Sequence, residues 1–306
     1  MKLIQSKICS LYLFRRRNSI LLPVSEVVSS FVHIQKKTTP LSRISAIFLT
    51  RVKMAFNYKS SFLMTLILNI VTIMMYFFFS RINPEMQIFG INSTYFEFAI
   101  IGLCLQMVVG TSLGTVSANI YNEILSGTWS SILLQFNFFE YSVGTTLAGV
   151  LISSTSIFVA LGMAYLTVGL YLVITFQEVI LIILLFILII LAHMAISMLF
   201  AAFTIFYQKA TNLISILYQL TKTFSGVVFP ISLLTGFPLL ISKSLPLTYG
   251  LHSIHQLLFS PTMNMEIVYI NCLILGGFIV LIGTIAYGLV SLSLKNIRKK
   301  GKVDWY

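Results

Sequence analysis

Six apolar stretches, each about 20 residues or longer, constrain this chain more than any other feature. A helix needs roughly 20 mainly apolar residues to cross the ~30 Å hydrocarbon layer of a bilayer. The stretches are Ser61–Ser80, Phe96–Ala118, Val143–Leu172, Val179–Tyr207, Leu213–Leu234 and Val268–Leu292. They predict an all-α integral membrane protein with six transmembrane helices. The third and fourth exceed a straight crossing, so we expect tilt, or a break in the third near Gly162 and Gly169.

Composition and charge agree with a lipid environment. Of the 306 residues, 58% are hydrophobic and 9% are charged, and the mean hydropathy is +0.95. A soluble domain of this length carries far more charge. The formal net charge is +12, but eleven of the twenty Lys and Arg precede Ser60 and five follow Ser293. This clustering is typical of topology signals and anionic headgroup contacts, and it argues against nucleic acid as a partner.

The same basic residues predict the orientation of the chain. With the N-terminus inside, the inner segments are 1–60, 119–142, 208–212 and 293–306. They hold 17 Lys and Arg, whereas the outer loops hold only Arg81 and Lys243, and Lys222 falls within the fifth stretch. Short segments rich in Lys and Arg stay in the cytoplasm. We therefore expect a multi-pass protein of the cytoplasmic membrane with both termini in the cytoplasm.

The residues before the first stretch divide into two parts. Leu41–Lys59 places apolar side chains on a helical stripe between basic ones, which predicts an amphipathic helix in the inner headgroup layer, either a simple anchor or a mechanical element. Residues 1–40 fit an organelle transit peptide, a disordered tail, or an over-extended start with Met54 or an earlier codon as the true beginning. The predicted organisation is a poorly structured basic extension at 1–40, a transmembrane domain at 41–295, and a basic cytoplasmic tail at 296–306.

Few side chains are placed for catalysis or metal binding. The three cysteines lack a CxxC spacing, and the four histidines lack the spacing and acidic company of a zinc site. His252 and His255, three residues apart, fit helix-capping or interfacial histidines. We therefore predict no catalytic, cofactor-binding or metal-binding residues.

One motif resembles a catalytic pattern. Gly110–Gly114 matches the G-x-S-x-G nucleophile pattern at Ser112, but that pattern needs a strand–turn–helix context. Gly110, Gly114 and Ala118 also form a row of small residues that allows another helix to approach closely, which we favour.

The segment between the second and third stretches is the most informative. Ala118–Leu134 reads as a short helix, a break at Gly127, and a second short helix with an apolar face. The loop carries Glu123 and Glu140 and no Lys or Arg. In an inner loop this acidity favours a protein partner over lipid.

This segment resembles the E-x-x-x-G-T-x-x-x-x-L-L signature of ABC-2 type permeases, the membrane subunits of ABC exporters. The matching residues are Glu123, Gly127, Thr128, Leu133 and Leu134. Two later segments, Phe224–Ser232 and Leu245–Tyr249, are similar to the family's S-G-x-x-F-P-x-S and L-P-L-T-Y elements. Asn137 stands near the family's usual Pro, and His255 near its usual Arg. The resemblance covers roughly residues 41–295.

The resemblance implies a role for each matching residue. Glu123–Leu134 would be a coupling helix in a groove of a separate ATPase subunit, with Glu123, Gly127, Thr128 and Leu133 as coupling residues. The alternative is a loop that only connects two spans. The chain contains no P-loop motif, so ATP and Mg would bind to the ATPase partner. A second permease subunit, identical or different, is also implied.

Two more residues are candidates for the transport path. Lys222 lies within the fifth stretch, where an ammonium group is costly unless it is paired, hydrated or snorkelling to the boundary. Pro230 would end the fifth helix at its outer end, before a short re-entrant piece at Gly236–Pro238 or an ordinary outer loop. The substrate is not readable from the sequence. The competing functions are a stand-alone secondary transporter or channel and, on Ser112 alone, an intramembrane enzyme.

Overall fold

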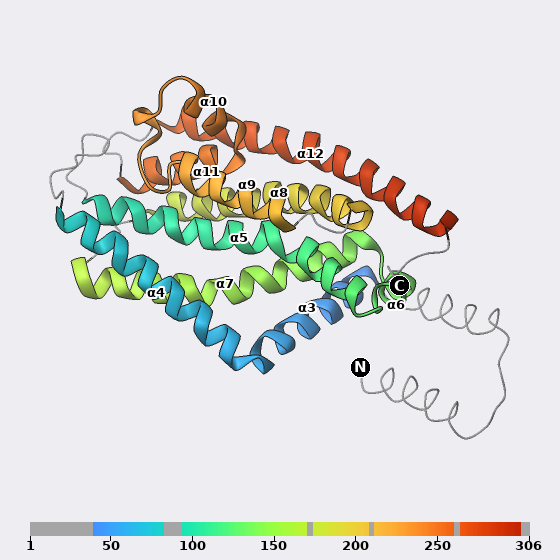
Figure 1. Ribbon diagram of the computed structural model, residues 1–306. Coiled ribbons are helices and arrows are strands. Elements are labelled where there is room, and N and C mark those ends of the chain that lie inside the picture. The colour runs from blue at the N-terminus through green and yellow to red at the C-terminus, as the bar shows by residue number, and fades with distance from the viewer. Residues whose placement is uncertain (1–38, 83–93, 170–173, 208–210, 260–263, 301–306) are drawn as a thin grey trace, which may run out of the picture. The chain divides into compact units, whose positions relative to one another are not determined.

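The computed structural model describes residues 39–82, 94–169, 174–207, 211–259 and 264–300, and within these ranges it contains helices and no strand (Figure 1). The chain divides into two compact units, Met1–Arg43 and Ile44–Tyr306, and apart from residues 40–43 the features below belong to the second. Most of the predicted extension 1–40 lies outside the described residues. The predicted tail at 296–306 begins inside a helix that continues to Lys300.

Five of the described helices are long and apolar enough to cross a membrane. They are α4 (Lys59–Ile82), α5 (Tyr95–Leu125), α7 (Phe138–Val168), α8 (Phe176–Tyr207) and α12 (Met265–Lys300). The shorter elements are α3 (Pro40–Asn57), α6 (Trp129–Gln135), α9 (Thr211–Phe224), the 3-10 helix η1 (Ile231–Leu233), α10 (Phe237–Ser244) and α11 (Pro246–Phe259). Five of the six predicted stretches coincide with long helices, as expected for a multi-pass helical membrane protein.

Glutamates begin three of the long helices. Glu97, Glu140 and Glu178 each accept a hydrogen bond from the backbone N–H three residues earlier, at 2.7–3.1 Å. These bonds satisfy N–H groups that have no partner inside the helix, and the negative charge suits the positive end of the helix dipole. The three carboxylates therefore start α5, α7 and α8.

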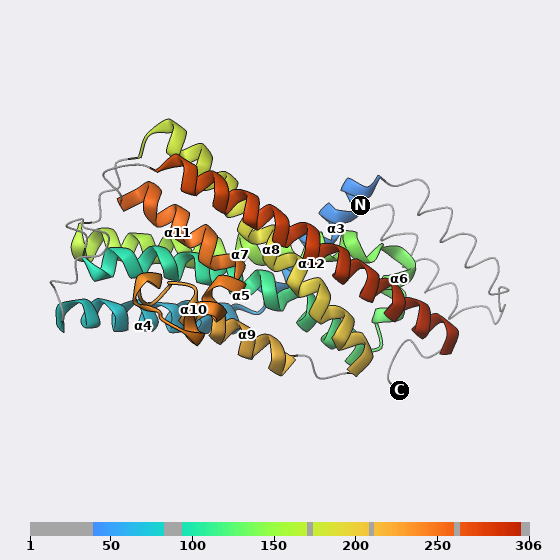
Figure 2. The same cartoon turned by 90° about the horizontal axis from the view of Figure 1, so that it is seen from above.

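Helix α5 is the central helix. In its most apolar 18-residue stretch 72% of the residues are buried, against 11% in α4. It packs against α7 on one side and α8 on the other, and α8 packs in turn against α12 (Figures 1 and 2). A side chain on α5 therefore faces protein in most directions, whereas α4 exposes most of its surface.

The predicted extent of the fifth helix, Leu213–Leu234, is wrong. Helix α9 ends at Phe224, and the bent chain that follows has Gly226 at φ 87°, in the left-handed region that favours glycine. Pro230 does not end the helix, because it lies six residues later, buried, at the start of η1. The 14 residues of α9 rise about 21 Å, less than the ~30 Å hydrocarbon layer.

The region after η1 forms a short helix where the sequence predicted a re-entrant piece or an ordinary outer loop. Helix α10 begins after Gly236, which has φ 61°, and leads directly into α11. On α11 the His255 Nε2 donates a hydrogen bond to the Phe98 carbonyl at 3.2 Å, and the His255 ring lies 4.1 Å from the Phe98 ring. His255 is buried. Its interpretation as a helix-capping residue is therefore wrong, because it attaches α11 to α5.

Two other predictions concern helix continuity. Helix α7 runs unbroken through Gly162 and ends at Gly169, whose φ of 69° is a usual helix terminator. The proposed break at Gly162 is therefore wrong. Helix α3 covers most of the predicted amphipathic helix at Leu41–Lys59, and the position of that helix in the headgroup layer stays a prediction.

Candidate functional site

A sharp turn at Ser126–Thr128 joins α5 to α6. Gly127 has φ 68°, and a Cβ added there would meet no atom within 4 Å, so the backbone conformation and not lack of space favours glycine. The Thr128 N–H donates to the Glu123 carbonyl at 2.9 Å and closes the end of α5. The predicted break at Gly127 is confirmed, although the first short helix is the last part of α5.

The carboxylate of Glu123 is held from α3. Arg51 Nη2 donates to Glu123 Oε1 at 2.6 Å and to the Tyr141 hydroxyl at 2.8 Å. The Thr128 hydroxyl donates to the other carboxylate oxygen, Oε2. The Arg51 and Glu123 side chains are 16% and 17% exposed, so these charge-assisted bonds are largely shielded from water. We call Arg51, Glu123, Thr128 and Tyr141 the polar clamp.

Aromatic side chains pack against the polar clamp. Tyr141 is buried on α7, and its ring meets the Trp129 ring edge-on with centroids 5.5 Å apart. The Arg51 guanidinium lies 5.5 Å from the Tyr141 ring centroid, within cation–π range. Trp129 is fully buried in the first turn of α6. The polar clamp and this aromatic pair therefore connect α3, α5, α6 and α7.

The predicted coupling residues are only partly together. Glu123 and Thr128 touch, and Gly127 forms the turn between them. Leu133 is instead half-buried against the apolar cluster that contains Trp129 and Tyr141. Leu134, one residue on, is 59% exposed. The structure thus makes Leu134 the more accessible of the two leucines.

Sequence reasoning missed two members of the polar clamp. Arg51 lies among the basic residues of the predicted amphipathic helix, which was a signal for its location but not for its partner. Tyr141 gave no signal. The acidic loop also has an internal explanation, because Glu140 caps α7 and Glu123 pairs with Arg51. Acidity alone is therefore no argument for a protein partner.

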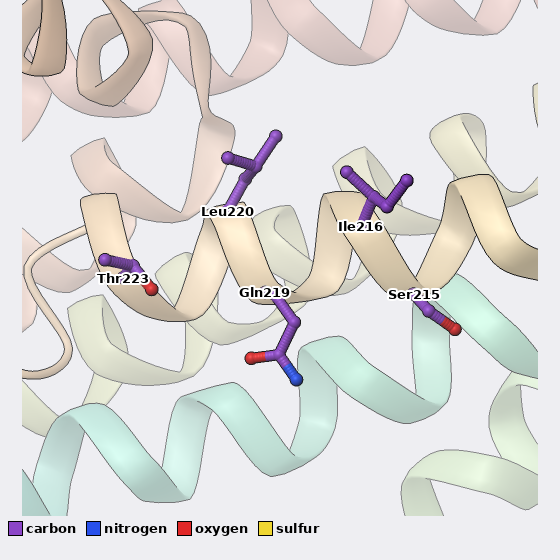
Figure 3. A pocket seen from close by; sticks show the side chains of 5 residues that line it. All are labelled: Ser215, Ile216, Gln219, Leu220 and Thr223. Carbon is purple, nitrogen blue, oxygen red and sulfur yellow. The ribbon is translucent and has the colours of Figure 1, made fainter.

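A cavity of about 1160 Å³ lies beside the polar clamp and is lined by residues from α3, α4, α5, α7 and α9. Arg51 and Glu123, which are paired to each other, are the only charged side chains among its described lining residues. Ser215 and Gln219 line it from α9, and Figure 3 shows both side chains on the side of that helix nearer α5. Five helices thus surround a space with hydrogen-bonding groups and no unpaired charge.

Hydrogen bonds between helices cross the walls of the cavity. Asn69 Nδ2 on α4 donates to the Ser156 hydroxyl on α7 at 2.9 Å. The Thr111 hydroxyl on α5 lies 3.4 Å from the Ser153 hydroxyl on α7. These contacts connect the three helices around the polar lining.

The predicted row of small residues has two different roles. A Cβ on Gly110 would lie 2.8 Å from Tyr218 Cε2, so α9 does approach closely there, as predicted. A Cβ on Gly114 would meet no atom within 4 Å, and this residue lines the cavity. The prediction of close helix packing is therefore wrong at Gly114.

The remaining candidates lie away from the polar clamp. Lys222 is half-buried in the last turn of α9, where the free carbonyl groups stabilise a cation, and neither it nor Pro230 lines the cavity. The Ser112 hydroxyl is buried and donates to the Val108 carbonyl of its own helix at 2.8 Å. In the part of the chain that the structure describes, no group of three or more His, Cys, Asp or Glu is placed to hold a metal ion.

Compared with protein-family models and with curated proteins, the chain matches none.

Proposed function

We propose that this chain is the membrane-spanning permease subunit of an ATP-binding cassette transporter, exporting a substrate across the cytoplasmic membrane with ATP hydrolysed by a separate subunit. The observation that carries the proposal is the turn at Gly127, fixed by the polar clamp at the end of the central helix. The residues that match the ABC-2 motif at Glu123, Gly127 and Thr128 are the residues that build this turn. The resemblance and the geometry therefore concern the same atoms.

The turn offers a surface to a partner. Leu125 and Leu134 are 44% and 59% exposed on either side of Gly127, and together they suit an apolar groove on an ATPase subunit. A push on α6 would pass through Thr128 to Glu123 and through Trp129 to Tyr141. Because α5 and α7 also line the cavity, such a movement would favour one state of cavity access over another.

The proposal includes six crossings and a second permease subunit. Termini on the same side need an even number of crossings, so α9 and the chain through α10 would together complete the sixth. Thr223 and Gln219, the second of which also lines the cavity, are exposed on α9. Such groups suit contact with another protein surface better than contact with hydrocarbon. We assign that surface to the second subunit.

The test is purification from the membranes of the source organism. The tagged chain should bring down a P-loop ATPase in stoichiometric amount, and the complex should hydrolyse ATP. A Gly127→Val variant should lose the ATPase while still inserting in the membrane. A chain that purifies without any ATPase and carries solute in liposomes under an ion gradient alone would support the stand-alone transporter instead.

A further inference from the structure

Four hydroxyl groups that line the cavity share one bonding pattern. Thr65, Thr111, Thr145 and Ser153 each donate their single hydroxyl hydrogen to a carbonyl three or four residues earlier, at 2.8–3.0 Å. Each oxygen keeps acceptor capacity after donating. These four hydroxyl groups therefore present acceptors to the cavity, and the Asn and Gln carboxamides of the lining add uncharged groups that both donate and accept. The lining suits a bound molecule that brings uncharged hydrogen-bonding groups, donors among them.

Charge restricts the class of that molecule further. The Glu123 carboxylate already accepts from Arg51 and Thr128, and Arg51 already donates to Glu123 and Tyr141. A cationic or anionic group in the cavity would therefore have to compete with the Arg51–Glu123 pair for a counter-ion, whereas an uncharged group would not. Donors without charge are hydroxyl or amide groups.

Part of the cavity lining is apolar. Phe62 and Leu66 on α4, Met107 on α5 and Ile152 on α7 line the same space as the hydroxyl groups. The volume of about 1160 Å³ exceeds the roughly 300–1,000 Å³ of ordinary small-molecule sites. A molecule with an apolar chain as well as a polar head fits this combination.

We propose that the cavity binds a neutral amphiphile, a molecule with an uncharged, hydroxyl-bearing head and a single apolar chain. Taking this molecule as the transported cargo rests on the proposed permease function. Binding itself does not, because the site is built entirely from residues of this chain.

The experiment uses the full chain in nanodiscs without any ATPase. Each of three competitors carries a single oleoyl chain, and they differ only in the head group. The head of 1-monooleoylglycerol has hydrogen-bond donors, that of methyl oleate has none, and that of oleoyl lysophosphatidic acid is charged. Each competes with a photoreactive monoacylglycerol, whose crosslinks are located by mass spectrometry. We expect crosslinks on α5 and α7, displaced by the glycerol ester at a concentration at least tenfold lower than by the other two.

Two pairs of variants test the location. Gly114→Leu should fill the cavity and reduce crosslinking at least tenfold. Gly283→Leu on α12 is its control, since Gly283 is also a half-buried helical glycine with open space at Cβ but does not line the cavity. Ser153→Ala should weaken displacement by the glycerol ester about 2–10-fold and leave displacement by methyl oleate unchanged. Ser154→Ala should change neither, because Ser154 follows Ser153 in the chain but does not line the cavity. The serine pair gives the answer if Gly114→Leu does not fold.

Each outcome bears on one proposal. Equal displacement by all three competitors, or undiminished crosslinking of Gly114→Leu, would mean unspecific lipid contact and overturn the amphiphile site. Specific binding by a chain that never captures an ATPase would keep the site and overturn the permease function. A chain that captures an ATPase but shows no specific binding of the glycerol ester would keep the permease function and overturn the amphiphile site.

Discussion

Arg51 and Glu123 lie 72 positions apart in the sequence and meet at 2.6 Å. Their mutual bond is shielded enough that removal of either side chain leaves the other partly buried without its counter-charge. Most surface ion pairs contribute little to stability, but this one is also hydrogen-bonded to Tyr141 and Thr128. At the residue scale, it is the contact whose removal is most informative.

We expect Arg51→Met to lower the free energy of unfolding by about 1.5–3 kcal/mol, the usual contribution of hydrogen bonds to charged groups. Glu123→Leu should lower it less than Arg51→Met, and the double variant should lose less than the sum of the two. Thermal unfolding in detergent provides this double-mutant cycle. Lys53→Met, an exposed change on the same helix, serves as the control. If the losses of the two single variants add up to the loss of the double variant, the interaction between Arg51 and Glu123 contributes nothing to stability.

Gly127 allows a test that separates backbone conformation from packing. At φ 68° a valine should cost about 1–3 kcal/mol, whereas asparagine, which tolerates the left-handed region, should cost clearly less. Because a Cβ here meets no neighbour, steric contact explains neither result. Thermal unfolding together with ATPase capture measures both consequences. If valine and asparagine behave alike, the positive φ is not what the position requires.

At the element scale, the sequence predicted the long helices, whose existence depends on the length of an apolar stretch. It failed to predict a helix end that depends on a single backbone angle. The stretches of α4, α5, α7, α8 and α12 were found because roughly 20 apolar residues are needed to cross a bilayer. The end of α9 was missed because Gly226 lies inside an apolar run, and hydropathy does not record φ. The proline led to the prediction that the helix ends at position 230, whereas the chain already bends at Gly226.

The candidate site shows the same division. The turn at Gly127 has local sequence signals, namely a glycine between two helical patterns and a motif around it. The Arg51–Glu123 pair has none, because it joins two distant elements and depends on how they pack. Gly114 was misread since small residues suit both a close helix contact and the wall of a cavity.

The bend after α9 provides a further prediction. Gly226→Ala should destabilise the protein by about 1–2 kcal/mol, because alanine is strained at φ 87° and its Cβ would lie 3.1 Å from Ile231 Cγ1. Pro230→Ala should cost less, since Pro230 does not end the helix. Thermal unfolding of the two variants compares them directly. The reverse order would restore Pro230 as the residue that ends α9.

At the scale of the whole molecule, the number of crossings decides where the termini lie. Five long helices alone would place the two ends on opposite sides of the membrane. The clustering of basic residues predicts the same side for both, which requires the chain from α9 through α10 to complete a sixth crossing. The length of α9 alone does not provide it.

We therefore expect single cysteines near residue 88, which lies outside the described residues, and at Lys243 to react with an impermeant external reagent. A cysteine placed after Lys295 should react only in inverted vesicles. Labelling before and after permeabilisation measures both, and a cysteine-free background supplies the control. External labelling both near residue 88 and beyond Lys295 would establish an odd number of crossings.

Because α5 is unbroken, the direction in which Gly114 faces the cavity and the direction in which Glu123 faces Arg51 are fixed relative to each other. Gly114 and Glu123 stand nine residues apart on one helix, so they are separated by about two and a half turns and about 13.5 Å. A rotation of the helix about its axis at one position is the same rotation at the other. One residue inserted between them would turn Glu123 about 100° away from Arg51, whereas seven would return it almost to register, displaced along the axis. A rotation of α5 at the turn is therefore transmitted unchanged to the cavity, without passing through a series of separate side-chain contacts.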